Sequence, residues 1–197
     1  MPKSSKSSPW PVTFGGLRAL TCLVERAILE DISHHVFAIG RDASVETAKL
    51  ILTLIDEGYE KRTWHGPNLK QSIRGVTARQ AAWRPEAGRH NIWELTLHAA
   101  YWKYAVRRRI EGGKRGSFVL QGSNFFPRPE KGKQNEAAWH ADKQLLEREH
   151  RALREAVARA LKTPQAERFL PQLWGVAFHD TYHAGQIRSL RRLVGAD

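Results

Sequence analysis

The clearest chemical pattern in the sequence is the segment His179-Asp-Thr-Tyr-His183, in which two histidines stand four residues apart. Side chains at this spacing lie one above the other on a helix, so two imidazoles can bind the same metal ion. The 197 residues include 9 histidines, however, and about 0.4 pairs at this spacing are expected by chance. The pair alone is therefore weak support for a metal site.

A helical projection brings a third histidine into the pattern. At about 100° per residue, His179 and His183 fall on an apolar face, opposite the arginines of the same segment. His98 falls on another apolar face, together with Leu95 and Trp102. All three imidazoles are therefore expected to point into one protein core.

Two interpretations of these three histidines remain open on spacing alone. Buried imidazoles need polar partners, so they could be core residues that are hydrogen-bonded to their neighbours. They could instead hold one divalent metal ion, zinc or nickel, because metal sites in helical bundles are built from side chains of facing helices. Three histidine ligands would leave a coordination position open for water or substrate, which is typical of a catalytic site.

The residues that flank the histidines are weaker candidates. Glu94 lies one turn before His98 and could act as a base or as an acceptor behind it, but Asn91 and Glu94 also have the spacing of a helix cap. Tyr182 and Gln186 could orient a bound water or substrate, although core packing explains them almost as well. No catalytic residue can be assigned among them.

Most other polar residues are expected at the surface. Asp180 lies at the edge of its apolar stripe, and four further histidines fall on loops or polar faces: His65, His90, His140 and His150. The chain has 32 Lys and Arg against 20 Asp and Glu, a formal charge of +12, which favours non-specific contact with polyanions. These cations, including the dense stretch that begins with Lys103, are scattered over several segments and are best explained as solvated helix faces. Specific nucleic-acid binding is not expected.

The cysteine count and the apolar segments favour a cytoplasmic protein. Cys22 is the single cysteine, which excludes an internal disulfide and a cysteine-based zinc site and agrees with a reducing compartment. No apolar stretch approaches the ~18 residues that a membrane-spanning helix needs, so no membrane association is expected. The first residues carry no apolar core of the signal-peptide type.

Hydrophobic periodicity predicts four long helices, over 45–62, 92–110, 136–161 and 171–194. Thr77 and Gln80 have the spacing of a capping box, which predicts a short helix before Pro85. No strand-like alternation occurs. The fold class is therefore predicted to be all-α, a four-helix bundle with a long crossover loop.

The connection between the second and third long helices is unusually long. Residues 111–134 are rich in glycine and include Phe118, Phe125 and Phe126. Such a loop is uncommon unless it covers a site or crosses the fold, so it is expected to lie near the histidines and to shape a pocket there. The bundle domain is predicted over residues 45–197, after a poorly integrated tail or extra helix at 1–44.

Two segments carry a family resemblance. NIWELTLHAAYW contains His98, and HDTYHAGQI contains His179 and His183. Together with WHGPNL, WRP, GSF, GSNFF and WGVAF, they resemble the DinB-like metal-binding four-helix-bundle proteins over about residues 45–194. The resemblance implies a divalent metal on these three histidines, a crossover connection and frequent homodimers.

The resemblance also suggests a class of reaction. Characterised relatives are thiol S-transferases and a mycothiol-dependent maleylpyruvate isomerase. The sequence is therefore expected to encode a metal-dependent transferase or hydrolase for a small electrophilic substrate, with a low-molecular-weight thiol as a candidate co-substrate. The alternative is a non-catalytic metal-binding stress protein or nucleic-acid-associated protein, which the positive charge favours.

Overall fold

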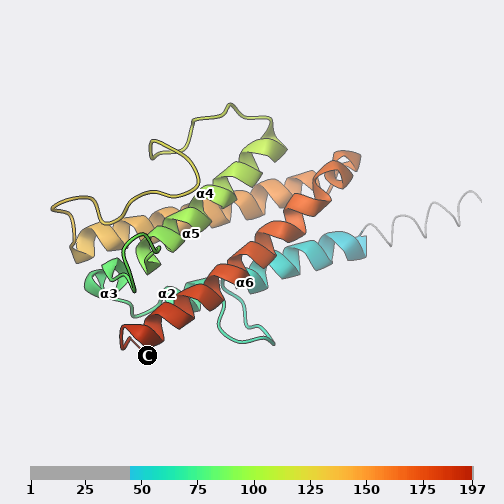
Figure 1. Cartoon of the computed structure of the whole chain (residues 1–197). Helices are drawn as coiled ribbons and strands as arrows, with labels where there is room; N and C mark the ends of the chain where they lie inside the picture. The colour runs from blue at the N-terminus through green and yellow to red at the C-terminus, as the bar shows by residue number, and fades with distance from the viewer. Residues whose placement is uncertain (1–44, 197) are drawn as a thin grey trace, which may run out of the picture. The chain divides into compact units, whose positions relative to one another are not determined.

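The computed structural model describes residues 45–196, so the expectation for residues 1–44 lies outside the described part of the chain. The described residues are helical from 45 to 59, and further helices follow along the chain. These are α2 (Leu69–Ile73), α3 (Ala78–Ala82), α4 (Ile92–Glu111), α5 (Glu136–Ala160), the 3₁₀ helix η1 (Pro164–Phe169) and α6 (Leu170–Leu193) (Figure 1). Residues 45–196 contain no strand, and the all-α prediction is confirmed.

Local sequence signals explain where these helices begin and end. The side chain of Asn91 accepts the Glu94 N–H at the start of α4, and Gly112 ends this helix with a φ of 69°, a left-handed conformation that glycine adopts without strain. Thr77 and Gln80 form the predicted capping box of α3. Asn68 and Gln71 form another at α2, a helix that the sequence analysis did not predict.

The helix of residues 45–59 packs with α4, α5 and α6 in one of two clusters of buried apolar residues. Its Ile55 is buried in a cluster with Val106 of α4, Leu153 of α5 and Leu173 of α6. Gly58 allows a close helix approach, because a Cβ at this position would lie only 2.8 Å from the carbonyl oxygen of Ala177.

The directions of α4 and α5 explain the long loop between them. Trp93, near the start of α4, packs on Trp139, near the start of α5, whereas Arg107 pairs with Glu149 further along both helices. The two helices therefore run parallel, and residues 112–135 must return along the length of α4. This return takes the loop past the middle of α4 (Figure 1).

Two charged residues that were expected at the surface lie in the core. Lys103 of α4 and Asp180 of α6 form an ion pair, and their side chains are 1% and 2% exposed. Burial raises the pKa of Asp180 to about 6, although the charge of Lys103 opposes this shift. The surface predictions for both residues were wrong, because each charge is neutralised by a partner that only the helix packing provides.

The surface prediction for His150 was also wrong. This residue of α5 is 1% exposed, and its ring stacks on that of Tyr59 with 3.9 Å between the ring centroids. Burial, with further contributions from nearby cations, lowers the pKa of His150 to about 2. His150 is therefore a neutral core residue.

No helix in the described residues combines the length and apolar character that crossing a membrane requires.

Replacing Lys103 by Met should lower the free energy of unfolding by about 3–5 kcal/mol, because it leaves the Asp180 carboxylate buried without its counter-ion. Urea unfolding at neutral pH measures this loss. The double variant Lys103→Met/Asp180→Leu should recover most of it, since it removes both charges. A single variant within about 1 kcal/mol of the wild type would contradict the buried ion pair.

Replacing His150 by Phe should make stability less sensitive to acid. The unfolded chain binds a proton at His150 below a pH of about 6.5, whereas the folded protein binds it only near pH 2. Falling pH therefore favours the unfolded state across this window, by about 1.4 kcal/mol per pH unit for this one group. Urea unfolding of His150→Phe at several values between pH 6 and pH 4 should show a slope shallower by about that amount, and the exposed-site control His140→Phe should keep the wild-type slope.

Candidate metal centre

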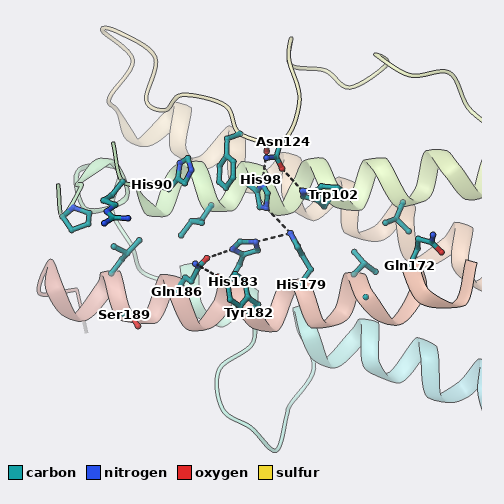
Figure 2. A pocket seen from close by; sticks show the side chains of 18 of the residues that line it. His90, His98, Trp102, Asn124, Gln172, His179, Tyr182, His183, Gln186 and Ser189 are labelled. Carbon is teal, nitrogen blue, oxygen red and sulfur yellow. Dashed lines mark hydrogen bonds between the residues drawn. The ribbon is translucent and has the colours of Figure 1, made fainter. Parts of the chain in front are cut away.

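Three histidines from two antiparallel helices converge at one point between α4 and α6. The Nε2 atom of His179 lies 3.0 Å from that of His98 and 3.1 Å from that of His183 (Figure 2). One ring nitrogen from each residue lies within 4.8 Å of the others, as expected for ligands of a single ion. His98 and His183 are buried and His179 is partly buried. The predicted convergence is therefore confirmed as geometry.

The outer nitrogens of two of these rings are bound to carbonyl oxygens. Nδ1 of His98 lies 2.9 Å from the backbone oxygen of Asn124, and Nδ1 of His183 lies 2.7 Å from Oε1 of Gln186. A carbonyl oxygen can only accept a hydrogen bond, so both Nδ1 atoms carry the proton. In the neutral rings, both Nε2 atoms then present a lone pair to the point of convergence.

Hydrogen bonds among the three neutral rings cannot satisfy every Nε2 atom at the point of convergence. Nε2 of His179 can carry one hydrogen, which satisfies only one of the two lone pairs that face it. Additional protonation is disfavoured, because burial lowers the pKa of His98 to about 4, that of His179 to about 3, and also that of His183. A cation between the three nitrogens would satisfy all of them.

The donor set fits a divalent metal ion. Nitrogen ligands of zinc lie about 2.0–2.1 Å from the ion, which places tetrahedral ligand nitrogens about 3.3 Å apart. The two Nε2 separations of 3.0 and 3.1 Å are close to that value. The hydrogen bonds on His98 and His183 are of the kind that orient metal-binding imidazoles.

The long loop supplies part of this centre. Asn124 has a φ of 66°, a left-handed conformation that asparagine tolerates, and its side chain accepts a hydrogen bond from the indole N–H of Trp102. The ring of Phe125 stacks on His98 with 4.0 Å between centroids and 11° between planes. The expectation that the loop shapes the site is confirmed for these two residues.

The other two loop phenylalanines lie elsewhere. Phe118 and Phe126 are buried against each other and against Tyr101. Neither lines the cavity at the histidines. Their expected role in the pocket was wrong, because both rings are buried in the main apolar core, against which Tyr101 also packs.

A cavity of about 1090 Å³ opens beside the three histidines, between α4 and α6. Its walls are mainly apolar and aromatic, and they include Leu95, Trp102, Val106, Phe125, Val176 and Leu190. Tyr182 and Gln186, both predicted near the site, also line this cavity, and the Gln186 amide donates to the Tyr182 hydroxyl. Tyr182 is nevertheless 63% exposed, so it is a residue of the cavity edge.

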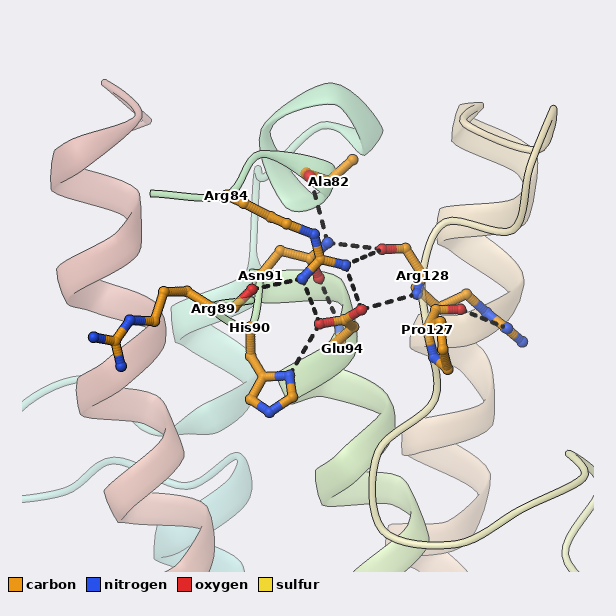
Figure 3. A network of polar contacts seen from close by, with 8 residues as sticks. All are labelled: Ala82, Arg84, Arg89, His90, Asn91, Glu94, Pro127 and Arg128. Carbon is orange, nitrogen blue, oxygen red and sulfur yellow. Dashed lines mark hydrogen bonds and ion pairs between the residues drawn. The ribbon is translucent and has the colours of Figure 1, made fainter. Parts of the chain in front are cut away.

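Glu94 is placed differently from the expectation that it supports His98. Both of its carboxylate oxygens are bound by the guanidinium of Arg84, and Oε1 also accepts the backbone N–H of Arg128 (Figure 3). Its other partner is Nδ1 of His90, at 3.1 Å. Burial opposes the ionisation of Glu94, but these hydrogen bonds outweigh it and lower the pKa of its carboxyl.

Several residues of the site could not be predicted from the sequence pattern. Asn124 and Phe125 were overlooked as individual partners of His98, because no periodic signal marks a loop residue. His90 was expected on a loop or a polar face, but its ring lines the cavity. The four-residue spacing between His90 and Glu94 is a usable signal, but it is informative only when the two residues are considered as a pair.

Comparison with known proteins supports the resemblance seen in the sequence. A family model described as the DinB superfamily matches residues 62–187, more than half of the chain, and this match includes all three histidines. No curated protein and no solved structure matches the chain. The family model confirms that the chain belongs to the DinB superfamily.

Proposed function

We propose that this protein is a metal-dependent enzyme that joins a small thiol, or water, to a small electrophilic substrate. The observation that carries the proposal is the convergence of three Nε2 atoms at the wall of an open cavity. His98, His179 and His183 would hold one divalent ion, with zinc and nickel the best fits to three imidazole ligands. Such an ion, when bound, lowers the pKa of a thiol or water molecule that it coordinates.

The surrounding residues favour a small organic substrate. The cavity is slightly larger than the range of about 300–1,000 Å³ that is common for small-molecule sites, so it has room for a thiol and a second reactant. Apolar side chains of Leu95, Val106 and Val176 on the cavity walls would limit the contact of water with the reacting groups. Trp102 and Phe125 offer aromatic faces to an apolar substrate.

The choice between transferase and hydrolase rests on the same cavity. A soft thiolate is a good ligand for a nitrogen-ligated zinc or nickel ion. The apolar walls of the cavity also favour a thiol over water as the nucleophile. We therefore place thiol transfer first and hydrolysis second.

The non-catalytic alternative rests on the charge of +12. Several arginines of the described residues are engaged by carboxylates within the chain: Arg84 with Glu94, Arg107 with Glu149, Arg128 with Asp142, and Arg154 with Asp56. These cations are partly neutralised, which supports the enzyme proposal over a nucleic-acid surface.

Replacing His98 by Ala should abolish stoichiometric binding of zinc or nickel, because it removes the single ligand from α4. Elemental analysis and calorimetric titration of the refolded, metal-depleted protein measure the stoichiometry. The variant His140→Ala, which removes an exposed histidine, should bind one ion per chain like the wild type. Wild-type protein that binds no ion, or His98→Ala that binds as tightly as the wild type, would disprove the metal site.

Metal-loaded protein should accelerate the reaction of cysteine or glutathione with an electrophilic aryl halide, or the hydrolysis of an activated ester. Absorbance of the aryl thioether product measures the first reaction, and absorbance of the released phenolate measures the second. Metal-depleted protein and the variant His179→Ala should show only the background rate. Equal rates for loaded protein, depleted protein and free metal, across all thiols and esters tested, would contradict the enzyme proposal.

A further inference from the structure

His90 is a second kind of histidine at the cavity, separate from the three that converge. Its ring lies parallel to that of Phe125, with 3.7 Å between centroids and 4° between planes, and Phe125 in turn stacks on His98. His90 is therefore separated from the candidate metal centre by one aromatic ring (Figure 2). Its side chain is 47% exposed and lines the cavity.

A buried carboxylate stands behind this imidazole. The side chain of Glu94 is 6% exposed, and Arg84 and the backbone N–H of Arg128 hold it in place (Figure 3). The ionised carboxylate can only accept hydrogen bonds, so Nδ1 of His90 donates to it. Nε2 of His90 then carries the free lone pair.

This arrangement differs from that of the three convergent histidines. Their Nε2 atoms face one another, whereas Nε2 of His90 has no protein partner among the described residues and is available to a molecule in the cavity. A carboxylate on one imidazole nitrogen, with the other nitrogen free, fixes the tautomer and stabilises the imidazolium that forms when the free nitrogen takes a proton.

We propose that His90, oriented by Glu94, is the proton acceptor and donor of the reaction at this cavity. This inference rests on the proposed function. Nε2 of His90 takes the proton of the thiol S–H, or of the water O–H, either directly or through one water molecule. The sulfur or oxygen electron pair forms the new bond to the electrophilic carbon. The bond from that carbon to the leaving group breaks, its electron pair stays on the leaving group, and His90 returns the proton there.

In these roles His90 is a catalytic residue and Glu94 is a positioning residue. Arg84 completes the set by fixing the carboxylate, as its two nitrogens bind both carboxylate oxygens. Two residues near the start of α4 would therefore have different roles. His98 belongs to the convergent centre, and Glu94 acts through His90.

The first test measures the nucleophilicity of His90 without any enzyme assay. Metal-loaded protein is acylated with a limiting amount of diethyl pyrocarbonate, and the rate at each histidine is read by peptide mass mapping. Replacing Glu94 by Gln should slow the acylation of His90 by about threefold or more, because the neutral amide no longer stabilises positive charge on the ring. The rates at His65 and His140 should stay unchanged. An unchanged rate at His90 in a folded Glu94→Gln variant would overturn the dyad.

The second test is kinetic. Replacing His90 by Gln should lower kcat by about 100-fold or more, the usual contribution of a general acid–base group, while KM and the metal content stay near the wild-type values. His140→Gln is the matched control and should keep full activity. An increase in KM with unchanged kcat would overturn the proposal, because His90 would then serve only in binding. If metal-loaded wild type catalyses none of the reactions, the proposed function fails, and the acylation rates still decide whether Glu94 activates His90.

Discussion

Three imidazole nitrogens converge at one point, with Nε2 of His179 about 3 Å from each of the other two, and protons cannot satisfy all three. This constraint explains the local design of the site. The carbonyl oxygen of Asn124 and the side chain of Gln186 hold protons on the outer nitrogens, so two lone pairs are directed inward. Three imidazoles that are weakly basic because of burial are suited to bind a divalent cation.

The rest of the fold holds this convergence in place. Parallel packing of α4 and α5 forces the connecting loop to return past His98, which brings Asn124 and Phe125 to the site. On α6, Asp180 follows His179 directly and pairs with Lys103 of α4 inside the bundle. Because this buried pair and the contact between His98 and His179 both join α4 to α6, the pair is a second point of attachment between the two helices that carry the histidines.

Helical periodicity was sufficient to predict the long helices and the convergence of the three histidines, since both depend on apolar spacing along one chain. It failed for Lys103 and Asp180, because a charged residue is assigned to the surface unless its partner is known, and that partner lies on another helix. The surface prediction for His150 failed because its neutral ring is buried against Tyr59, on the helix of residues 45–59. Glu94 has the spacing of a cap, but Arg84 binds its carboxylate instead. Such pairings depend on tertiary register, which spacing within one helix does not contain.

The coordination of the bound ion tests the central claim most directly. X-ray absorption at the zinc or nickel edge, on protein loaded with one equivalent of metal, reports the number and type of ligands. Three imidazole nitrogens at about 2.0–2.1 Å, with one or more light-atom ligands besides, is the predicted result. A spectrum without the outer-shell scattering of imidazole rings, or one unchanged in the variant His183→Ala, would contradict a three-histidine centre.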